Sequence, residues 1–138
     1  MRDVYVIGSF STAFGRWAAK DHRALAKDAV LGVLQDAELA DGSALGQAYF
    51  GNCLMHMIGQ TMIRGQTCLS DLMEQGVLPE RLPIINVEGA CATGSLAFHL
   101  AWKDVLVGPN RSRAGDRRRK ALRPIRSRKR ARRSRRRL

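Results

Sequence analysis

Hydrophobic residues recur along this chain with two periods, and these periods predict alternating strands and helices. Three short apolar stretches are typical of buried strands: Val4–Ile7, Ala48–Phe50 and Leu82–Val87. Three longer stretches carry apolar residues at helical spacing: His22–Leu39, Ile58–Gly76 and Ala92–Leu106. We expect Asp21 to cap the first helix. This order favours an α/β fold, in which mostly parallel strands form a mixed sheet and the helices are crossover connections.

The last helix differs from the other two because it is apolar on nearly every side. Leu96, Ala97 and Leu100 mark one face, while Phe98 and Trp102 make the opposite face apolar as well. We therefore expect this helix to be buried nearly all round.

The segment INVEGACATGSLAFHLAW, residues 85–102, joins the third strand to this helix and carries the candidate chemistry. We expect Gly89 to supply the permissive backbone for a sharp exit from the strand, which places Cys91 on the turn. A helix N-terminus offers unpaired N–H groups and a positive dipole end, which favour a thiolate and can hold an oxyanion. Cys91 is therefore the candidate catalytic nucleophile.

Cys91 has two other possible interpretations, a buried structural cysteine and a hydrolase-type nucleophile. Free cysteines are usually buried and behave as small hydrophobic residues, and the local pattern alone leaves that interpretation open. The nucleophile elbow of α/β-hydrolases, with cysteine in place of serine, does not fit. The run Gly89-Ala-Cys91-Ala-Thr-Gly94 has one residue too many after the nucleophile.

The segment NVEGACATGSLAFH, from Asn86 to His99, resembles the nucleophile segment of thiolases, especially the sterol-carrier-protein-type branch of acetyl-CoA acetyltransferases. Three earlier segments, VYVIGS, FGNCLMHMIGQ and GVLPERLPIINVE, are similar in order and spacing to the first half of a thiolase. The resemblance implies a thiolase-like N-terminal half over residues 1–107. It also implies that Cys91 accepts an acyl group from a coenzyme A thioester, with no tightly bound cofactor, and that the protein is a homodimer.

The thiolase second half supplies a GHP histidine, a further histidine or asparagine for an oxyanion hole, and a CxG cysteine. None of these motifs follows Val107 in this sequence. The resemblance therefore implies an acyltransferase fragment that is catalytically incomplete alone and exposes the apolar face of its last helix. A non-catalytic remnant that associates with intact homologues remains an alternative.

Charge divides the chain into two unlike parts. Residues 1–107 hold eight basic and eleven acidic residues, a net charge of −3, whereas residues 108–138 hold sixteen basic residues and one acidic residue, a net charge of +15. We expect this arginine-rich tail to be disordered. It gives the alternative function, nucleic-acid binding through the tail alone. We favour a tail without a selected role, because thiolase character is lost abruptly near Val107, as a shifted reading frame in a G+C-rich gene would produce. The absence of interleaved aromatic residues for base stacking further weakens single-strand recognition.

Metal binding and a membrane span are not expected. Cys53 and His56 have the spacing of a ligand pair, but a zinc site needs four ligands and no second close pair exists. The residues themselves favour a buried Cys53 and a polar loop residue at His56, whereas the thiolase resemblance implies that His56 lines the pocket. Three cysteines without framework spacing and no signal peptide favour the cytoplasm. The longest uncharged stretch, Gly42–Ile63, is interrupted by four glycines and several polar residues, so it does not span a membrane.

Overall fold

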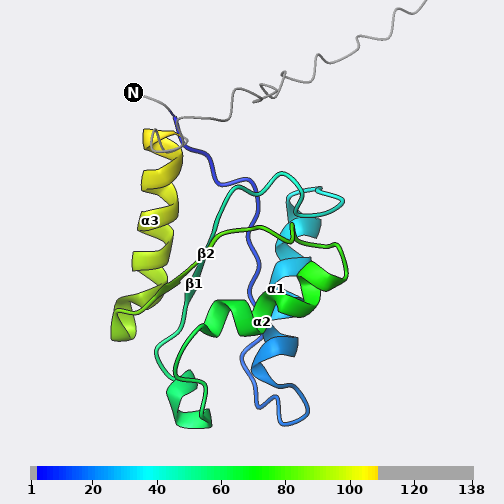
Figure 1. Cartoon of the computed structure of the whole chain (residues 1–138), viewed down its shortest axis with the longest axis vertical. Coiled ribbons are helices and arrows are strands. Elements are labelled where there is room, and N and C mark those ends of the chain that lie inside the picture. Colours follow the sequence, from blue (N-terminus) through cyan, green and yellow to red (C-terminus); the bar gives the residue numbers. More distant parts are fainter. Residues whose placement is uncertain (1–2, 109–138) are drawn as a thin grey trace, which may run out of the picture.

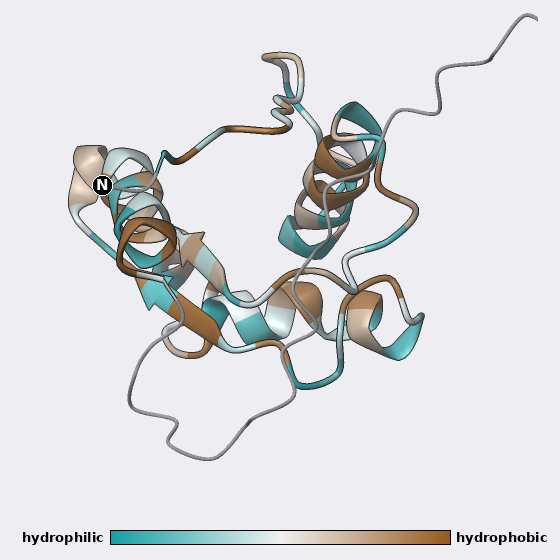
Figure 2. Cartoon of the chain, turned by 90° about the horizontal axis from the view of Figure 1, so that it is seen from above, coloured by the Kyte–Doolittle hydropathy of each residue, from teal (hydrophilic) through white to brown (hydrophobic). Residues whose placement is uncertain are grey.

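The computed structural model describes residues 3–108 of the 138-residue chain. The elements follow one another in this order: α1 (His22–Asp36), β1 (Ala48–Gly51), η1 (Met55–Ile58), α2 (Arg64–Glu74), β2 (Ile84–Val87), η2 (Ala90–Ala92) and α3 (Thr93–Val107). The elements labelled η are short 3₁₀ helices. Figures 1 and 2 show α3 on one side of the two strands and α1 with α2 on the other. The predicted tail beyond Gly108 lies outside the described residues.

The sheet is a parallel pair, which confirms the α/β class and the predicted parallel pairing. β1 lies beside β2 with Ala48 opposite Ile84 and Gly51 opposite Val87. Because the strands run in the same direction, a crossover must connect them, and α2 supplies it. Within residues 3–108 the sheet has these two strands only, so the structure shows no mixed sheet there.

The strand predicted at Val4–Ile7 is wrong. This segment pairs with no strand in the described part of the chain, and the side chains of Tyr5 and Ile7 are 75% and 70% exposed. The segment is attached to α1 two residues after Ile7, where the Ser9 backbone N–H donates to the Asp36 carboxylate (2.7 Å). An apolar run alone does not make a strand, because a strand needs a neighbour with free backbone groups on which to pair.

α1 begins as predicted and ends earlier than predicted. Asp21 caps it, because its Oδ1 accepts the Ala24 backbone N–H at 2.8 Å. The helix stops at Asp36 instead of Leu39 because Glu38 adopts a left-handed backbone (φ 54°) and the Leu39 N–H bonds back to the Leu34 carbonyl at 2.9 Å. This pattern is a Schellman cap, which satisfies carbonyl groups that would otherwise lack partners.

The second predicted helix is divided into two pieces. Gly59 ends η1 with a left-handed backbone (φ 86°), and α2 begins only at Arg64, after Ile63 has itself adopted φ 44°. Gly65 therefore lies in the first turn of α2, where it faces both strands. A Cβ atom placed on it would come within 2.6 Å of Phe50 Cβ and of Ile84 Cγ2. Glycine at this position lets the helix approach the sheet closely.

The hydrophobic core lies on the α2 side of the sheet. Its buried members come from η1, α2 and the segment after α2: Met55, Cys68, Leu69, Leu72, Leu78 and Leu82. Leu72 has no exposed surface. Partly buried residues of α1 and of both strands pack against this cluster. The small sheet is thus stabilised mainly through its contact with the crossover helix.

α3 packs against β1 on one side and is exposed on the other, so the prediction that it is buried nearly all round is wrong for the described structure. Phe98 is 59% exposed, and Trp102 and Val105 are also exposed. Tyr49 on β1 donates a hydrogen bond to Asp104 on α3. Desolvation, and next the Asp104 carboxylate, raise the pKa of Tyr49 to about 12, so this hydroxyl remains a hydrogen-bond donor further into the alkaline range than an ordinary tyrosine.

None of the helices within residues 3–108 is both long and apolar enough to cross a membrane.

We expect Leu72→Ala to lower the free energy of unfolding by about 2–5 kcal/mol, because it opens a cavity in a filled core. That loss is a large part of the total stability of a small domain, which is about 5–15 kcal/mol. Urea denaturation followed by circular dichroism measures it. Leu54→Ala is the matched control, because Leu54 is 61% exposed and its loss should change little. Equal losses of unfolding free energy in the two variants would contradict the position of Leu72 in the core.

Candidate functional site

Cys91 lies on the turn between β2 and α3, within η2, which is the position predicted from the sequence. Its side chain is exposed, whereas Cys68 is buried in the core and Cys53 is intermediate. The interpretation of Cys91 as a buried core cysteine therefore does not hold. The buried cysteine is Cys68, and its burial raises the pKa of the thiol.

The sharp exit from β2 takes place over Gly89 and Ala90. Gly89 (φ −161°, ψ 38°) has left the strand conformation as predicted, and the left-handed backbone lies at Ala90, which has φ 46°. A non-glycine residue in this region costs about 1–3 kcal/mol, and it persists only where the surrounding contacts hold it. The residue directly before Cys91 is thus held in a strained conformation.

Thr93 holds the turn from its helical side. It is buried, and its hydroxyl donates to the Ala90 carbonyl (2.7 Å) while it accepts the Gly89 N–H (2.9 Å). The Ala92 N–H donates to the Gly89 carbonyl at 2.9 Å. These bonds enclose Cys91 on both sides along the chain. Our sequence analysis did not single out Thr93, although a threonine at a helix start is a known signal for such capping.

A polar network joins the carboxyl ends of both strands, upstream of this turn. Arg64 donates to the Asn52 carbonyl after β1 and to the Glu88 carboxylate after β2, the latter at 3.2 Å. Asn86 accepts the Gly65 N–H at 2.6 Å. A small cavity of about 170 Å³ lies at this junction, lined by Thr61, Ile63, Arg64, Asn86, Val87 and Glu88. The sequence analysis named none of these polar side chains as site residues, because their spacing shows no motif.

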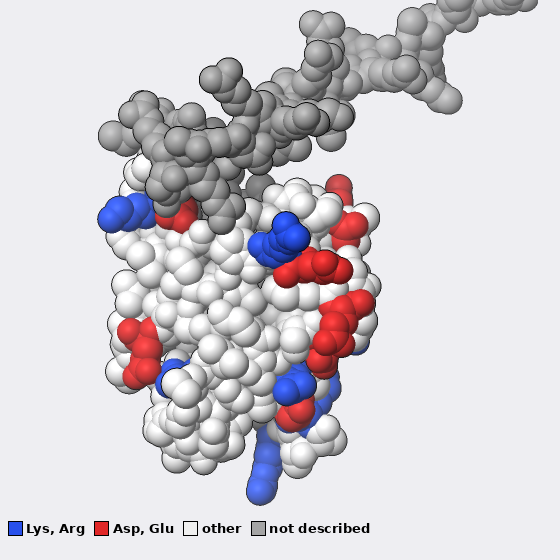
Figure 3. Space-filling view, viewed as in Figure 1, with Lys and Arg blue, Asp and Glu red and all other residues white. Residues whose placement is uncertain are grey.

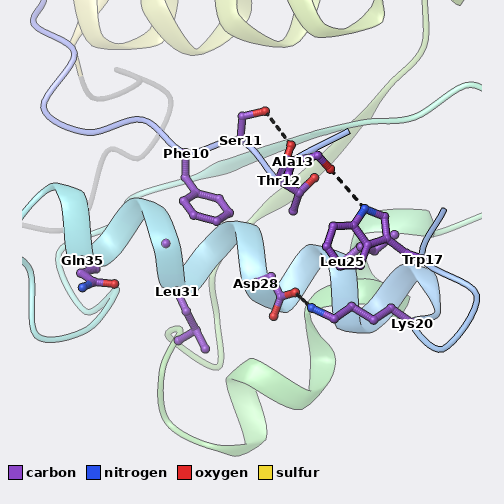
Figure 4. Close-up of a pocket in the computed structure, with 11 residues that line it drawn as sticks. Phe10, Ser11, Thr12, Ala13, Trp17, Lys20, Leu25, Asp28, Leu31 and Gln35 are labelled. Carbon is purple, nitrogen blue, oxygen red and sulfur yellow. Dashed lines mark hydrogen bonds and ion pairs between the residues drawn. The ribbon is translucent and has the colours of Figure 1, made fainter. Parts of the chain in front are cut away.

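A larger cavity of about 370 Å³ lies elsewhere, between the segment from Phe10 to Lys20 and helix α1 (Figure 4). Lys20 pairs with Asp28 at its edge, and the Lys20 ammonium lies 5.1 Å from the centre of the Trp17 ring. Cys91 does not line this cavity. The larger of these two cavities is therefore not at the candidate site, because the exposed thiol of Cys91 lies on η2.

His56 and Cys53 lie together, but the contact is local. His56 Nδ1 is 2.9 Å from the Cys53 carbonyl oxygen, so the ring is engaged with the backbone of its own loop. His56 lines neither of the two cavities described above, which gives no support to its interpretation as pocket-lining. Within residues 3–108, no cluster of three or more His, Cys, Asp or Glu side chains is arranged to hold a metal ion.

Comparison with known proteins places this sequence in a family. The family model described as "Thiolase, N-terminal domain" matches residues 4–112. Benzoylsuccinyl-CoA thiolase subunit BbsB of Thauera aromatica is 39% identical over 107 residues, which are 78% of this chain and 25% of that protein. An acetyl-CoA acetyltransferase of Methanocaldococcus jannaschii is 32% identical over 108 residues, 78% of this chain and 26% of that protein.

A second acetyl-CoA acetyltransferase, from Methanothermobacter thermautotrophicus, is 36% identical over 108 residues, again 78% of this chain and 27% of that protein. The chain thus spans about a quarter of the length of these relatives. Because the family model covers more than half of the chain, the chain belongs to the thiolase family and carries sequence of its N-terminal domain.

Proposed function

We propose that this chain is the nucleophile-bearing part of a thiolase-type acyltransferase, in which Cys91 takes an acyl group from a coenzyme A thioester. The observation that carries the proposal is the exposed thiol on a tightly hydrogen-bonded turn between a strand and a helix. Membership of the thiolase family supports the substrate class, since the relatives are named as acetyl-CoA acetyltransferases and a benzoylsuccinyl-CoA thiolase. The proposed reaction needs no tightly bound cofactor.

The proposed step is a transfer between two thiols. The Cys91 thiolate attacks the thioester carbonyl carbon, and the carbonyl oxygen becomes an oxyanion in the tetrahedral intermediate. The backbone N–H of Cys91 itself is the proposed donor to that charge, because the N–H groups of Gly89, Ala92 and Thr93 are bonded within the turn. The bond between the carbonyl carbon and the coenzyme A sulfur then breaks. The products are acyl-Cys91 and coenzyme A, which carries the proton that Cys91 gave up.

Further steps need groups that this sequence does not contain. Carbon–carbon bond formation or cleavage requires an acid/base at the substrate carbon, and the thiolase motifs expected for it, GHP and CxG, are absent after Val107. We propose that the chain accepts an acyl group but does not complete a catalytic cycle alone. The alternative of nucleic-acid binding rests on residues 109–138, which lie outside the described structure.

The exposed apolar face of α3 is part of the same proposal. Its members are Phe98, Trp102 and Val105, which are 59%, 39% and 56% exposed. Figure 3 shows charged side chains of both signs around the edge of one face of the molecule, with residues that carry no charge, polar and apolar alike, between them. Exposed apolar patches of this kind mark association surfaces. We propose that the chain forms a homodimer that covers this face.

The first prediction concerns thiol reactivity. Iodoacetamide near neutral pH, followed by peptide mass analysis, should label Cys91 fastest in the folded protein. Cys53, which is intermediate in exposure, is the internal comparison, and Cys68 is protected by burial. Denaturation in urea should bring the three rates together. A Cys91 rate no higher than that of Cys53 in the folded protein would count against an accessible, activated nucleophile.

The second prediction concerns turnover. We expect acetyl-CoA to acetylate Cys91 stoichiometrically, while acetyl-CoA supplied alone or acetoacetyl-CoA with coenzyme A gives no sustained turnover. Each acid/base group typically contributes 10² to 10⁴ in rate, so two absent groups should cost about 10⁴ or more. Cys91→Ala is the control and should abolish acetylation. Cys91-dependent turnover at rates ordinary for an enzyme would refute the claim that further groups are needed.

The third prediction concerns association. Phe98→Glu combined with Trp102→Glu should shift the chain toward monomer, because the charges oppose burial of the α3 face. Light scattering after gel filtration, over a range of protein concentrations, measures the molecular mass. Leu54→Glu is the control, since Leu54 is exposed but lies outside α3. A wild-type chain that remains monomeric at high concentration would contradict the proposed dimer.

A further inference from the structure

We propose that Arg64 is a positioning residue for Cys91, acting through Glu88 to fix the turn that carries the thiol. This inference rests on the proposed acyl transfer to Cys91 and assigns a role to a side chain about 27 positions earlier in the sequence. Arg64 itself is not placed in contact with the reacting atoms.

The contacts of Arg64 join the start of α2 to two segments that are distant in sequence, the residues that follow β1 and β2. Its side chain is 14% exposed and donates to the Asn52 carbonyl after β1, to the Thr61 carbonyl (3.4 Å) and to Glu88 Oε2 (3.2 Å). A guanidinium presents five N–H donors in a fixed planar fork, so it can hold several acceptors in one geometry. Arg64 therefore fixes where β1 ends relative to the residue that follows β2.

The ion pair itself contributes little stability. Glu88 is 58% exposed, and pairs with one exposed partner contribute about 0–1 kcal/mol at most. The significance of the contact is its place along the chain, because only Gly89 and Ala90 separate Glu88 from Cys91. Thr93 holds the same turn from its other end through bonds of 2.7 and 2.9 Å. The thiol thus lies between two fixed points.

A second set of bonds supports the same strand end from the first turn of α2. Asn86 accepts the Gly65 N–H at 2.6 Å and donates to Gln66 Oε1 at 2.8 Å. Gln66 in turn donates to the Ile84 carbonyl at 3.1 Å. Three consecutive residues of α2, Arg64 to Gln66, thus bind β2 and the residue after it. The end of β2 cannot shift unless these bonds break.

Backbone strain occurs at the same place. Three non-glycine residues in the described part of the chain have positive φ: Glu38, Ile63 and Ala90. Glu38 closes α1, whereas Ile63 directly precedes Arg64 and Ala90 directly precedes Cys91. A β-branched residue in this region is an outlier, and such conformations persist only where neighbouring contacts determine them. Strained residues thus lie next to both partners of the Arg64–Glu88 contact, Ile63 directly before Arg64 and Ala90 two positions after Glu88.

The test uses the full chain with the substitutions Arg64→Met, Arg64→Lys and Glu88→Gln. Arg23→Met is the matched control, because Arg23 pairs with Asp71 at 3.7 Å and has no recorded contact with the turn. The readouts are the saturating rate of Cys91 acetylation, the half-saturating acetyl-CoA concentration, and the ratio of Cys91 to Cys53 alkylation. Urea denaturation measures the folded fraction of each variant, and rates are compared per folded molecule.

We expect Arg64→Met to lower the saturating acetylation rate about 100-fold, the scale on which misplacement by 1 Å acts. The half-saturating concentration should stay nearly unchanged, because Arg64 is not proposed to bind acetyl-CoA. Arg64→Lys should not restore the rate, since a single ammonium cannot reproduce the fork. Glu88→Gln should lower the rate in the same direction, and Arg23→Met should leave it as in the wild type.

Several results would overturn the inference. One is an unchanged acetylation rate in folded Arg64→Met, and another is full rescue by Arg64→Lys. If Arg64→Met unfolds, Glu88→Gln decides, because its side chain is exposed and keeps its size; an unchanged rate there refutes the role of Arg64. If the wild-type chain is not acetylated at all, the proposed function fails, and the alkylation ratio alone then tests Arg64. A ratio equal to that of the wild type in both Arg64→Met and Glu88→Gln refutes positioning.

Discussion

Because β1 and β2 are parallel, the chain must run back from the end of β1 to the end of the sheet where β2 starts. α2 makes this return and packs closely on both strands. The same geometry brings the carboxyl ends of the two strands to one edge. Asn52 and Glu88, which follow β1 and β2, therefore lie near each other although 36 positions separate them. The polar network and the turn with Cys91 both depend on this pairing. The packing of Leu72 beneath the sheet depends on it as well.

The elements flanked by clear local signals could be predicted from the sequence. Asp21 marked the start of α1, and the β-branched run before Gly89 marked β2 and the turn with Cys91. These features depend on a few neighbouring residues, so they can be predicted from a short stretch of sequence without knowledge of the folded structure. The C-terminal end of α1 and the start of α2 were missed, because left-handed backbone at Glu38 and Ile63 is unusual for those residue types.

Features that depend on distant parts of the chain could not be predicted. The apolar segment Val4–Ile7 has the composition of a strand, but pairing depends on whether a neighbouring strand exists. The outer face of α3 has the composition of a core, but burial depends on what covers it. Arg64 shows no spacing motif with Glu88 or Asn52, so only the folded structure brings these groups together.

Gly65 also limits how this sequence can change. A methyl group there would meet Phe50 and Ile84 at 2.6 Å, inside the distance that any real carbon contact tolerates, whereas a methyl group on Gly94 or Gly46 would meet nothing within 4 Å. A side chain at Gly46 or Gly94 would therefore meet no steric barrier, while position 65 in the first turn of α2 has no room for one. Any larger side chain would push α2 away from the sheet and break the bond between the Gly65 N–H and Asn86. The missing Cβ atom at position 65 thus sets how closely α2 approaches the sheet in this protein.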